Sequence, residues 1–385
     1  MKFNNSSPDS RNVILEVQDL QVDINQRQVL NIDSLKVFEG DILVIIGPNG
    51  SGKTTLLQSM ALILNPVRGF IKFRGKIPGS ESERLAVRRR FAVVFQESLL
   101  LDCSVMDNIV LGLKLRGVPV RDRIKRVDRW LGRFGISELA RRNAKTLSGG
   151  EAKRVSLARA FSLEPEVLFL DEPFSALDTP AYQSLFDDFR SVVKETGVTT
   201  VLVTHDYNEA MSLGTRIVVL MNGSIRQSGP PEEVFSYPID KEVAEFLRAG
   251  NLIPGKVVTR TEGLVKVLIG EREVEAISDL LPGDEVMLYL SYDAVTVSVD
   301  RPGSQSSARN RFEGIITQLV PLGQLFKVVI DCGFPLISVI TRNSAEELGL
   351  RIGSHVVASF KATAVHLIKK SGSGVFSTDK TMKFN

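Results

Sequence analysis

The sequence predicts an α/β domain followed by a smaller all-β domain. Between about residues 11 and 240, short apolar runs alternate with helical patterns, as expected for a parallel sheet with helices on its faces. From residue 251 onward, short alternating strands are separated by Gly and Pro turns, which is typical of small β-barrels. We therefore place an α/β domain at 11–240, with a helical subdomain at about 85–145, and an all-β domain at 251–370. The tail at 371–385 is predicted to be disordered.

The composition is that of an ordinary soluble protein with a full hydrophobic core. The 385 residues are 43% hydrophobic and 24% charged, and the net charge of +3 is too small to indicate a nucleic-acid partner. Basic residues outnumber acidic ones from Arg84 to Lys145. Within this stretch, Arg121, Lys125 and Arg129 recur at helical spacing. They predict a solvated helix face, with contact to an anionic surface or a partner protein as the alternative.

Neither a disulfide framework nor a membrane span is expected. The two cysteines, Cys103 and Cys332, are far apart in the sequence, and a reducing cytosol fits them. No apolar stretch approaches the ~18 to 20 residues needed to cross a bilayer. The N-terminus is polar and carries no signal-peptide pattern. We expect a protein that does not span a membrane but can dock on one.

The first chemical signal is a glycine-rich loop at 47–54 between a strand and a helix. The apolar run Ile42–Ile46 predicts a buried strand, and Thr55–Leu64 predicts a helix stopped by Asn65-Pro66. A chance glycine turn would lack this context, which is the one a phosphate-binding loop requires. Its backbone N–H groups and the helix N-terminus attract phosphates. The candidate residues for a bound nucleotide are Gly47, Pro48, Asn49, Gly50, Ser51, Gly52, Lys53, Thr54 and Thr55. Of these, Lys53 would reach the β- and γ-phosphates, and Thr54 would ligate Mg²⁺.

Polar side chains follow three further apolar strands at their carboxyl ends. Gln96 ends one strand and could sense the γ-phosphate or Mg²⁺, although a polar residue there is often only a surface residue. Asp171 and Glu172 end the next, where Asp171 can hold Mg²⁺ and Glu172 can take the proton of an attacking water. His205 ends the third. A lone histidine is usually structural, but parallel sheets bind ligands at the carboxyl ends of their strands.

The segment Leu147–Glu151 opens another predicted helix. Ser148 and Glu151 have capping-box spacing, so helix capping alone could explain the pair. The adjacent Gly149 and Gly150 leave the helix N-terminus bare, which favours close approach of an anion.

Together these motifs resemble the nucleotide-binding domain of ABC transporters over about residues 11–240. The loop 47–54 is similar to Walker A, Gln96 to the Q-loop glutamine and Leu147–Glu151 to the LSGGQ signature. Asp171-Glu172 is similar to Walker B, 175–178 to the D-loop and His205 to the switch histidine. The resemblance implies a P-loop ATPase that acts as a homodimer with ATP and Mg²⁺. ATP on Lys53 of one chain would be closed over by Ser148 and Gly150 of the other, and Gly149 and Asp178 would join the nucleotide site.

Two departures from the family pattern affect these expectations. The position of the usual adenine-stacking aromatic residue is Ile24, which packs on a base without aromatic stacking. Glu151 replaces the signature glutamine, which preserves the capping box but brings a carboxylate toward the partner's γ-phosphate. We expect activity to survive this second change.

The all-β half contains an internal repeat at a constant offset of 70 residues. Residues 228–250 are expected to link it to the first domain. The repeat predicts two OB-like modules at about 251–300 and 309–370, joined by 301–307. The matched pairs are Gly283 and Gly353, Val286 and Val356, Leu290 and Phe360, Ala294 and Ala364, Val295 and Val365, and Val297 and Leu367.

The second module resembles the Mop/TOBE modules of oxyanion-transport proteins. It has Ser307-Ala-Arg-Asn310, Thr341-Arg-Asn-Ser344 and Lys361-Ala-Thr363 where that family holds an oxyanion. Hydroxyl and N–H donors with two cations suit a tetrahedral dianion. The implied ligands are Ser307, Arg309, Thr341, Ser344, Lys361 and Thr363; the alternative is an ordinary accessory β-domain. The first module lacks this set, with Arg248-Ala-Gly-Asn251 and Ser291-Tyr292 instead. It is predicted to be a structural copy that can line a site across the dimer.

We therefore expect the ATP-hydrolysing subunit of a molybdate or tungstate importer, peripheral on the cytoplasmic face of the membrane. Two copies would dock on two membrane permease subunits near Gln96 and Leu99–Ile109, and would serve an extracellular or periplasmic solute-binding protein indirectly. The β-modules would sense internal molybdate or tungstate as a regulatory ligand. An importer ATPase for sulfate, sugar or polyamine is the nearest alternative. A non-transport ATPase acting on DNA or ribosomes, supported only by the basic stretch, and an oxyanion-storage protein with a vestigial ATPase are further alternatives.

Overall fold

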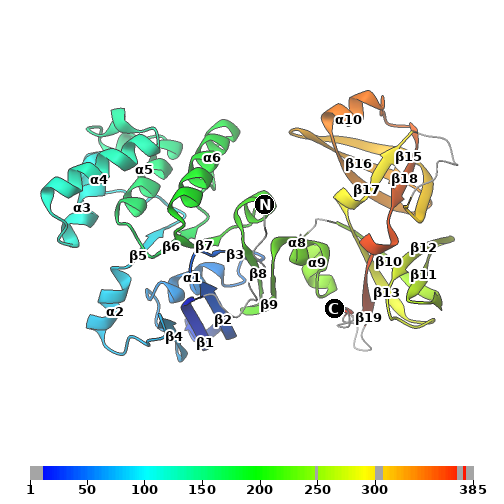
Figure 1. The fold of residues 1–385 in the computed structure, drawn as a ribbon, viewed down its shortest axis with the longest axis horizontal. Helices are drawn as coiled ribbons and strands as arrows, with labels where there is room; N and C mark the ends of the chain where they lie inside the picture. Colours follow the sequence, from blue (N-terminus) through cyan, green and yellow to red (C-terminus); the bar gives the residue numbers. More distant parts are fainter. Residues whose placement is uncertain (1–11, 248–249, 300–306, 371–375, 379–385) are drawn as a thin grey trace. The chain divides into compact units, whose positions relative to one another are not determined.

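The computed structural model describes residues 12–247, 250–299, 307–370 and 376–378. The chain forms two compact units that meet in the sequence between Pro231 and Glu232 (Figure 1). The first unit is α/β and the second is mainly β, which confirms the predicted fold class. No helix in the described part of the chain combines the length and the apolar character that crossing a bilayer requires.

The first unit is built on a six-stranded sheet in the order β5-β6-β7-β3-β8-β9. Its central strands are short, apolar and almost completely buried, because helices and a second sheet cover both faces. All neighbouring pairs are parallel except β8 with β9. The strands are β3 (Ile42–Ile46), β5 (Phe91–Val94), β6 (Val167–Asp171), β7 (Thr199–Val203), β8 (Arg216–Met221) and β9 (Ser224–Gly229).

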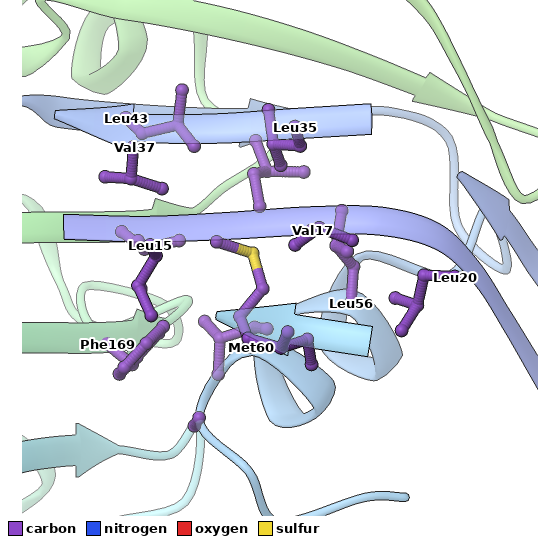
Figure 2. Packing of buried hydrophobic residues seen from close by; sticks show 14 of the residues in the cluster. Leu15, Val17, Leu20, Leu35, Val37, Leu43, Leu56, Met60 and Phe169 are labelled. Atoms are coloured by element: carbon purple, nitrogen blue, oxygen red, sulfur yellow. The ribbon is translucent and has the colours of Figure 1, made fainter. Parts of the chain in front are cut away.

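A small antiparallel sheet packs over this one with helix α1 (Lys53–Met60) between them. Its order is β2-β1-β4, from β1 (Val13–Ile24), β2 (Arg27–Phe38) and β4 (Arg68–Phe73). Figure 2 shows Leu15 and Val17 of β1 beside Met60 of α1 and Phe169 of β6. Helix α1 ends four residues before the expected Leu64, since Leu62 adopts a left-handed φ of 58° that a helix cannot continue through.

The other helices of the first unit surround the parallel sheet. They are α2 (Glu81–Arg88), α3 (Val105–Leu115), α4 (Val120–Arg133), α5 (Gly149–Ser162), α6 (Thr179–Thr196) and α7 (Tyr207–Leu213). Two short 3-10 turns, Ser137–Leu139 and Ala144–Thr146, precede α5. Helices α3 and α4 pack on α5 as a helical subdomain, and β5, which lies within the expected range of about 85–145, pairs with β6 in the sheet. Arg121, Lys125 and Arg129 lie on the exposed face of α4.

The second unit starts with two helices where a link was expected. Helix α8 (Pro231–Ser236) spans the unit boundary and is followed by α9 (Lys241–Leu247). Two sheets follow, in the orders β12-β11-β10-β13-β19-β20 and β14-β18-β15-β16-β17. The strands of the first module are β10 (Gly250–Thr261), β11 (Leu264–Ile269), β12 (Arg272–Ile277), β13 (Glu285–Ser291) and β14 (Thr296–Ser298). Those of the second are β15 (Asn310–Leu322), β16 (Leu325–Asp331), β17 (Pro335–Thr341), β18 (His355–Phe360) and β19 (His366–Lys370), with helix α10 (Arg342–Glu347) after β17.

The internal repeat is visible in the structure as an exchange of strands between the modules. Strand β13, the 3-10 turn η4 (Tyr292–Ala294) and β14 correspond to β18, η5 (Ala362–Ala364) and β19. However, β19 pairs with β13, and β14 pairs with β18. Each module therefore gives its last strand to the other, and one continuous core contains buried residues of both.

Two equivalent asparagines also join the modules. The side-chain amide of Asn251, at the start of β10, forms two hydrogen bonds with the backbone of Ile337 in β17, of 2.9 and 2.6 Å. Asn310, at the start of β15, does the same with the backbone of Glu275 in β12, at 2.9 and 2.7 Å. Both side chains are buried, so these bonds satisfy amides that would otherwise be costly inside the protein.

The C-terminal segment differs from the prediction of a disordered tail at one place. Strand β20 (Phe376–Thr378) pairs antiparallel with β19. Lys370 lies opposite Phe376, and Ile368 lies opposite Thr378. An unpaired edge of β19 explains how these three residues find backbone partners. The rest of the tail and most of the 301–307 segment lie outside the described residues.

Candidate functional site

The phosphate-binding loop leads from β3 into α1 as the sequence predicted. Gly52 is the N-cap of α1 with a φ of 98°, a conformation that side-chain-bearing residues rarely adopt. A Cβ atom on Gly47 would lie 2.0 Å from the backbone oxygen of Leu220, so only glycine fits there. The hydroxyl of Ser51 is buried in the loop without a hydrogen-bond partner in the described part of the chain. This unpaired donor suits a phosphate oxygen.

Lys53 and Thr54, the first two residues of α1, both form hydrogen bonds through their side chains. The Lys53 ammonium donates to the carbonyl oxygens of Gly47 and Pro48, at 2.9 Å each. Burial lowers the pKa of Lys53, while Glu172 and Asp171 act in the opposite direction. The Thr54 hydroxyl donates to the Asp171 carboxylate at 3.1 Å. Burial raises the pKa of Asp171, against the effect of this bond. Two of the residues expected at the Mg²⁺ site, Thr54 and Asp171, are thus in contact.

The tips of β5, β6 and β7 converge on the Glu172 carboxylate. The Gln96 amide donates to one of its oxygens at 3.2 Å, and His205 Nδ1 lies 3.2 Å from the other. Glu172 has a left-handed φ of 45°, which is strained for a residue with a side chain, and its N–H is bonded to Val203 at 2.9 Å. Three residues from separate segments of the chain, Gln96, Glu172 and His205, thereby form one polar cluster.

The signature and D-loop segments both occur at helix N-termini. Ser148 and Glu151 form a complete capping box on α5, with bonds of 2.7 and 3.3 Å. The backbone N–H of Ser148 lowers the pKa of Glu151, whose carboxylate is therefore engaged in the cap. A side chain on Gly149 would meet open space, so capping and an open helix N-terminus occur together at this point. Asp178 caps α6 by accepting from the N–H of Ala181 at 2.9 Å.

Other residues expected near the nucleotide lie in the loop, in the first turns of α1 and α5, and at the end of β1. Asn49 and Gly50 are exposed in the loop, and Thr55 is half-buried in the first turn of α1. Gly150 is the second residue of α5. Ile24 ends β1 and is 41% exposed, so its side chain is accessible to a flat ligand.

Two buried charged residues near the cluster were missed from the sequence. Lys153 of α5 donates to the backbone oxygens of Gln96 and Glu172, and only its place on the apolar side of a helical pattern signals it. Glu209 in α7 is 5% exposed and has one oxygen without a hydrogen-bond partner in the described residues. Burial raises its pKa to about 7. Its position four residues after His205 was the available signal.

Four of the six expected oxyanion residues share one end of the second module. Arg309 and Lys361 flank the paired residues Asn310 and Phe360 of β15 and β18. Arg309 is bonded to Glu275 of β12, and η5, which contains Thr363, packs against the same strand. Ser307 is exposed two residues before Arg309.

Thr341 and Ser344 lie at a different place on the second module from these four residues. Thr341 ends β17 opposite Leu325, which itself pairs with Leu322 at the far end of β15. The Thr341 hydroxyl caps α10 and lies 2.8 Å from that of Ser344. Strand β17 packs against η4 of the first module, whereas Arg309 and η5 contact β12. The antiparallel pairing of β15, β16 and β17 therefore places the hydroxyl pair near the far end of β15, whereas the two cations lie near its start.

Comparison with known proteins matches both units to described families. Residues 30–175 match the ABC transporter family, and residues 306–367 match the TOBE domain. The molybdate/tungstate import ATP-binding protein of Pyrococcus horikoshii is 37% identical over 360 residues, covering 92% of this chain and 99% of that protein. The spermidine/putrescine import ATP-binding protein of Borreliella afzelii is 37% identical over 263 residues, covering 67% of this chain and 74% of that protein.

A solved structure matches the first unit. It is a dimeric ATP-binding cassette in a post-hydrolysis state with ADP and phosphate, with a TM-score of 0.52 and 26% identity, covering 57% of this chain and 99% of that one. The match, the strand-tip cluster and the near-complete overlap with import ATP-binding proteins agree. The chain belongs to the ABC transporter family, as an ATP-binding subunit that couples ATP hydrolysis to transport.

Proposed function

We propose that this protein is the ATPase subunit of an importer that energises molybdate or tungstate uptake. The observation that carries the proposal is the cluster of Gln96, Glu172 and His205, combined in one chain with a TOBE domain. The Pyrococcus relative named for molybdate/tungstate import extends over both units, whereas the spermidine/putrescine relative aligns over less of the chain.

The residues of the first unit have separate roles in hydrolysis. The loop 47–52 and Lys53 bind the phosphates, and Thr54 with Asp171 would hold Mg²⁺, with Gln96 as a further ligand. Bound Mg²⁺ would supply positive charge against the phosphate oxygens. Glu172 takes the proton of the attacking water, and His205, which contacts its carboxylate, orients the reacting groups.

We place the active form in a homodimer at the cytoplasmic face of the membrane. Ser148, Gly149, Gly150 and Asp178 would complete the nucleotide site of the second copy, in line with the dimeric state of the solved cassette. Two copies would dock on two permease subunits, with a solute-binding protein on the other side of the membrane. The exposed apolar side chains of Leu99 and Leu101, which follow Gln96, suit such docking.

The second unit would sense the transported oxyanion. Arg309 and Lys361 supply charge, and Ser307 and Thr363 supply hydroxyl donors at the same end of the module. Thr341 and Ser344 lie apart from these four residues, at the end of β17 and in α10. We propose that they contribute to a site completed by a second copy. Strong inhibition requires differential affinity, because a tenfold preference for the inactive form supplies only ~1.4 kcal/mol per site.

Calorimetric titration of the full-length protein with molybdate and with tungstate tests this function. Wild type should bind at least one of them, and Lys361→Gln should bind about tenfold more weakly because a charge-assisted hydrogen bond is lost. Lys370→Gln is the matched control, since Lys370 is an exposed lysine of the same unit that pairs with Glu285 at 3.1 Å. Folded wild type that releases no heat with either oxyanion would leave the second unit architectural and favour an importer of another solute.

A further inference from the structure

One face of α5 carries three hydrogen-bond donors that hold the segment after β5. They are spaced at successive turns: Lys153, Ser156 and Arg159. Ser156 donates to the carbonyl oxygen of Ser98 at 3.0 Å, and Arg159 donates to Ser98 and Leu99, at 3.1 Å each. Lys153 donates to the carbonyl of Gln96 itself. The backbone that carries Gln96 is therefore fastened to the helix that starts at the signature motif.

Lys153 differs from the other two donors because it also reaches β6. Its ammonium lies 3.5 Å from the carbonyl oxygen of Glu172, the residue assigned as the general base. The same carbonyl accepts from the Ser175 hydroxyl at 2.9 Å. One side chain of α5 thus joins the backbones of two residues, Gln96 and Glu172, whose side chains also bond to each other at 3.2 Å.

The burial of Lys153 makes a purely space-filling role expensive. Its side chain is only 7% exposed, and its bonds go to carbonyl oxygens and not to a carboxylate. Burying an ammonium costs several kcal/mol unless its hydrogen bonds are well made, and an apolar side chain of similar length would avoid that cost. The ammonium is therefore best explained by the two carbonyls that it holds.

The position of Lys153 along α5 connects it to the other nucleotide site. It lies five residues after Ser148, about one and a half helical turns. Ser148 caps α5 and, under the proposed function, contacts the nucleotide bound by the second copy. We expect this capped helix of 14 residues to move as one body, so that a shift at Ser148 would displace the Lys153 ammonium relative to Gln96 and Glu172.

We propose that Lys153 is a positioning residue that couples the two nucleotide sites of the dimer. The N-terminal end of α5, with the signature motif, contacts the nucleotide bound by the partner. Through Lys153 this helix is connected to Gln96 and Glu172, which act on the nucleotide bound by their own chain. This inference rests on the proposed function. It predicts that removing the ammonium impairs both hydrolysis in the same chain and closure on the partner.

The first test compares steady-state ATP hydrolysis of Lys153→Met and Ser156→Ala. Methionine keeps the length and loses the donors. Lys153→Met should lower kcat about tenfold, the effect of losing a charge-assisted bond, while KM for ATP changes less than about twofold because the phosphate loop is untouched. Ser156→Ala, which removes one bond to the same segment but none to Glu172, should keep kcat within about twofold. Lys153→Gln, with one amide donor, should fall between them.

The second test measures ATP-driven dimer formation in the Glu172→Gln background, where turnover is blocked but the Glu172 carbonyl remains. Adding Lys153→Met should raise about tenfold the ATP concentration that gives half-maximal dimer, while ATP binding to the dilute monomer is unchanged. Lost turnover with unchanged dimer formation would overturn the coupling, and unchanged turnover would overturn the whole inference. If Lys153→Met does not fold, Lys153→Gln carries both tests. Absence of ATP binding by wild type would instead refute the proposed function.

Discussion

The two units assemble their candidate sites in opposite ways. In the first unit, residues from Lys53 to His205 meet because the carboxyl ends of parallel strands share one edge of a sheet. In the second, three segments of one module lie at two places, because Thr341 ends β17 near the far end of β15 while Arg309 and Lys361 lie near its start. The order of motifs along a chain therefore determines a site only when the topology brings the ends of the elements together.

The units also differ in the buried group that responds to pH. In the first, Glu209 is an acid whose pKa burial raises to about 7. In the second, His366 is a base whose pKa burial lowers to about 4. Both are favoured in their neutral form, so alkali opposes the folding of one unit and acid opposes that of the other.

The largest expected effect is on the strand-tip cluster of the first unit. Glu172→Gln should reduce ATP turnover by about a thousandfold or more while ATP binding persists, because the amide cannot accept the water proton. Glu166→Gln is the matched control, since Glu166 lies at the opposite end of β6 and pairs with Arg74 at 2.8 Å. Wild-type turnover by Glu172→Gln would remove Glu172 as the base.

The pH dependence of the second unit gives the next effect. The pKa of His366 is about 4 in the fold and near 6.5 when unfolded, so its contribution is complete above pH 6.5 and is lost as the pH falls toward 4. We expect the free energy of unfolding of the second unit to fall by about 1–3 kcal/mol between pH 6.5 and pH 4. Calorimetric unfolding of wild type and His366→Gln measures it.

A pH profile for His366→Gln as steep as that of wild type would contradict this assignment. Glutamine is a suitable replacement because its amide can still donate to the carbonyl oxygen of Pro238, which lies 3.2 Å from His366 Nε2.

The junction of the exchanged modules should be sensitive to a single amide. Asn310→Ala removes two hydrogen bonds and leaves the backbone N–H and C=O of Glu275 without these partners, which costs about 2 kcal/mol in the free energy of unfolding of the second unit. Asn251→Ala, its equivalent at Ile337, should cost about as much. Urea unfolding measures both, and a loss confined to one of them would show that the modules are not equivalent at this contact.

The smallest effect concerns Glu209 in the first unit. Its pKa is near 4.5 when unfolded and about 7 in the fold, so the stabilisation is complete below pH 4.5 and is lost as the pH rises through 7. Glu209→Gln should therefore raise the free energy of unfolding of this unit by about 1–2 kcal/mol at pH 8, with little change at pH 4.5. Fluorescence of Trp130, the one tryptophan of the chain, reports the first unit. Equal effects at both pH values would show that ionisation of Glu209 is not the cause.

Prediction from sequence was effective wherever a local pattern had one structural solution. Buried apolar runs became parallel strands, and the polar residue after each run lies at a strand tip, as Gln96 and His205 show. The capping box at Ser148 depends on neighbours within three residues and was predicted for the same reason. The end of α1 was predicted too late in the sequence, because the left-handed backbone at Leu62 does not change the apolar pattern.

By itself, the sequence determined the two-part fold class, the phosphate loop, the order of the ATPase motifs and the repeat of 70 residues, since each depends on local spacing. Only the tertiary structure decided that β14 and β19 are exchanged, that Thr341 is separated from Arg309, and that Lys153 joins Gln96 to Glu172. Those facts depend on which distant backbones lie beside one another. From local spacing alone, the last strand of each module could pair equally well within its own module or with the other one. Only the closed core, with its buried asparagine contacts, selects the exchange.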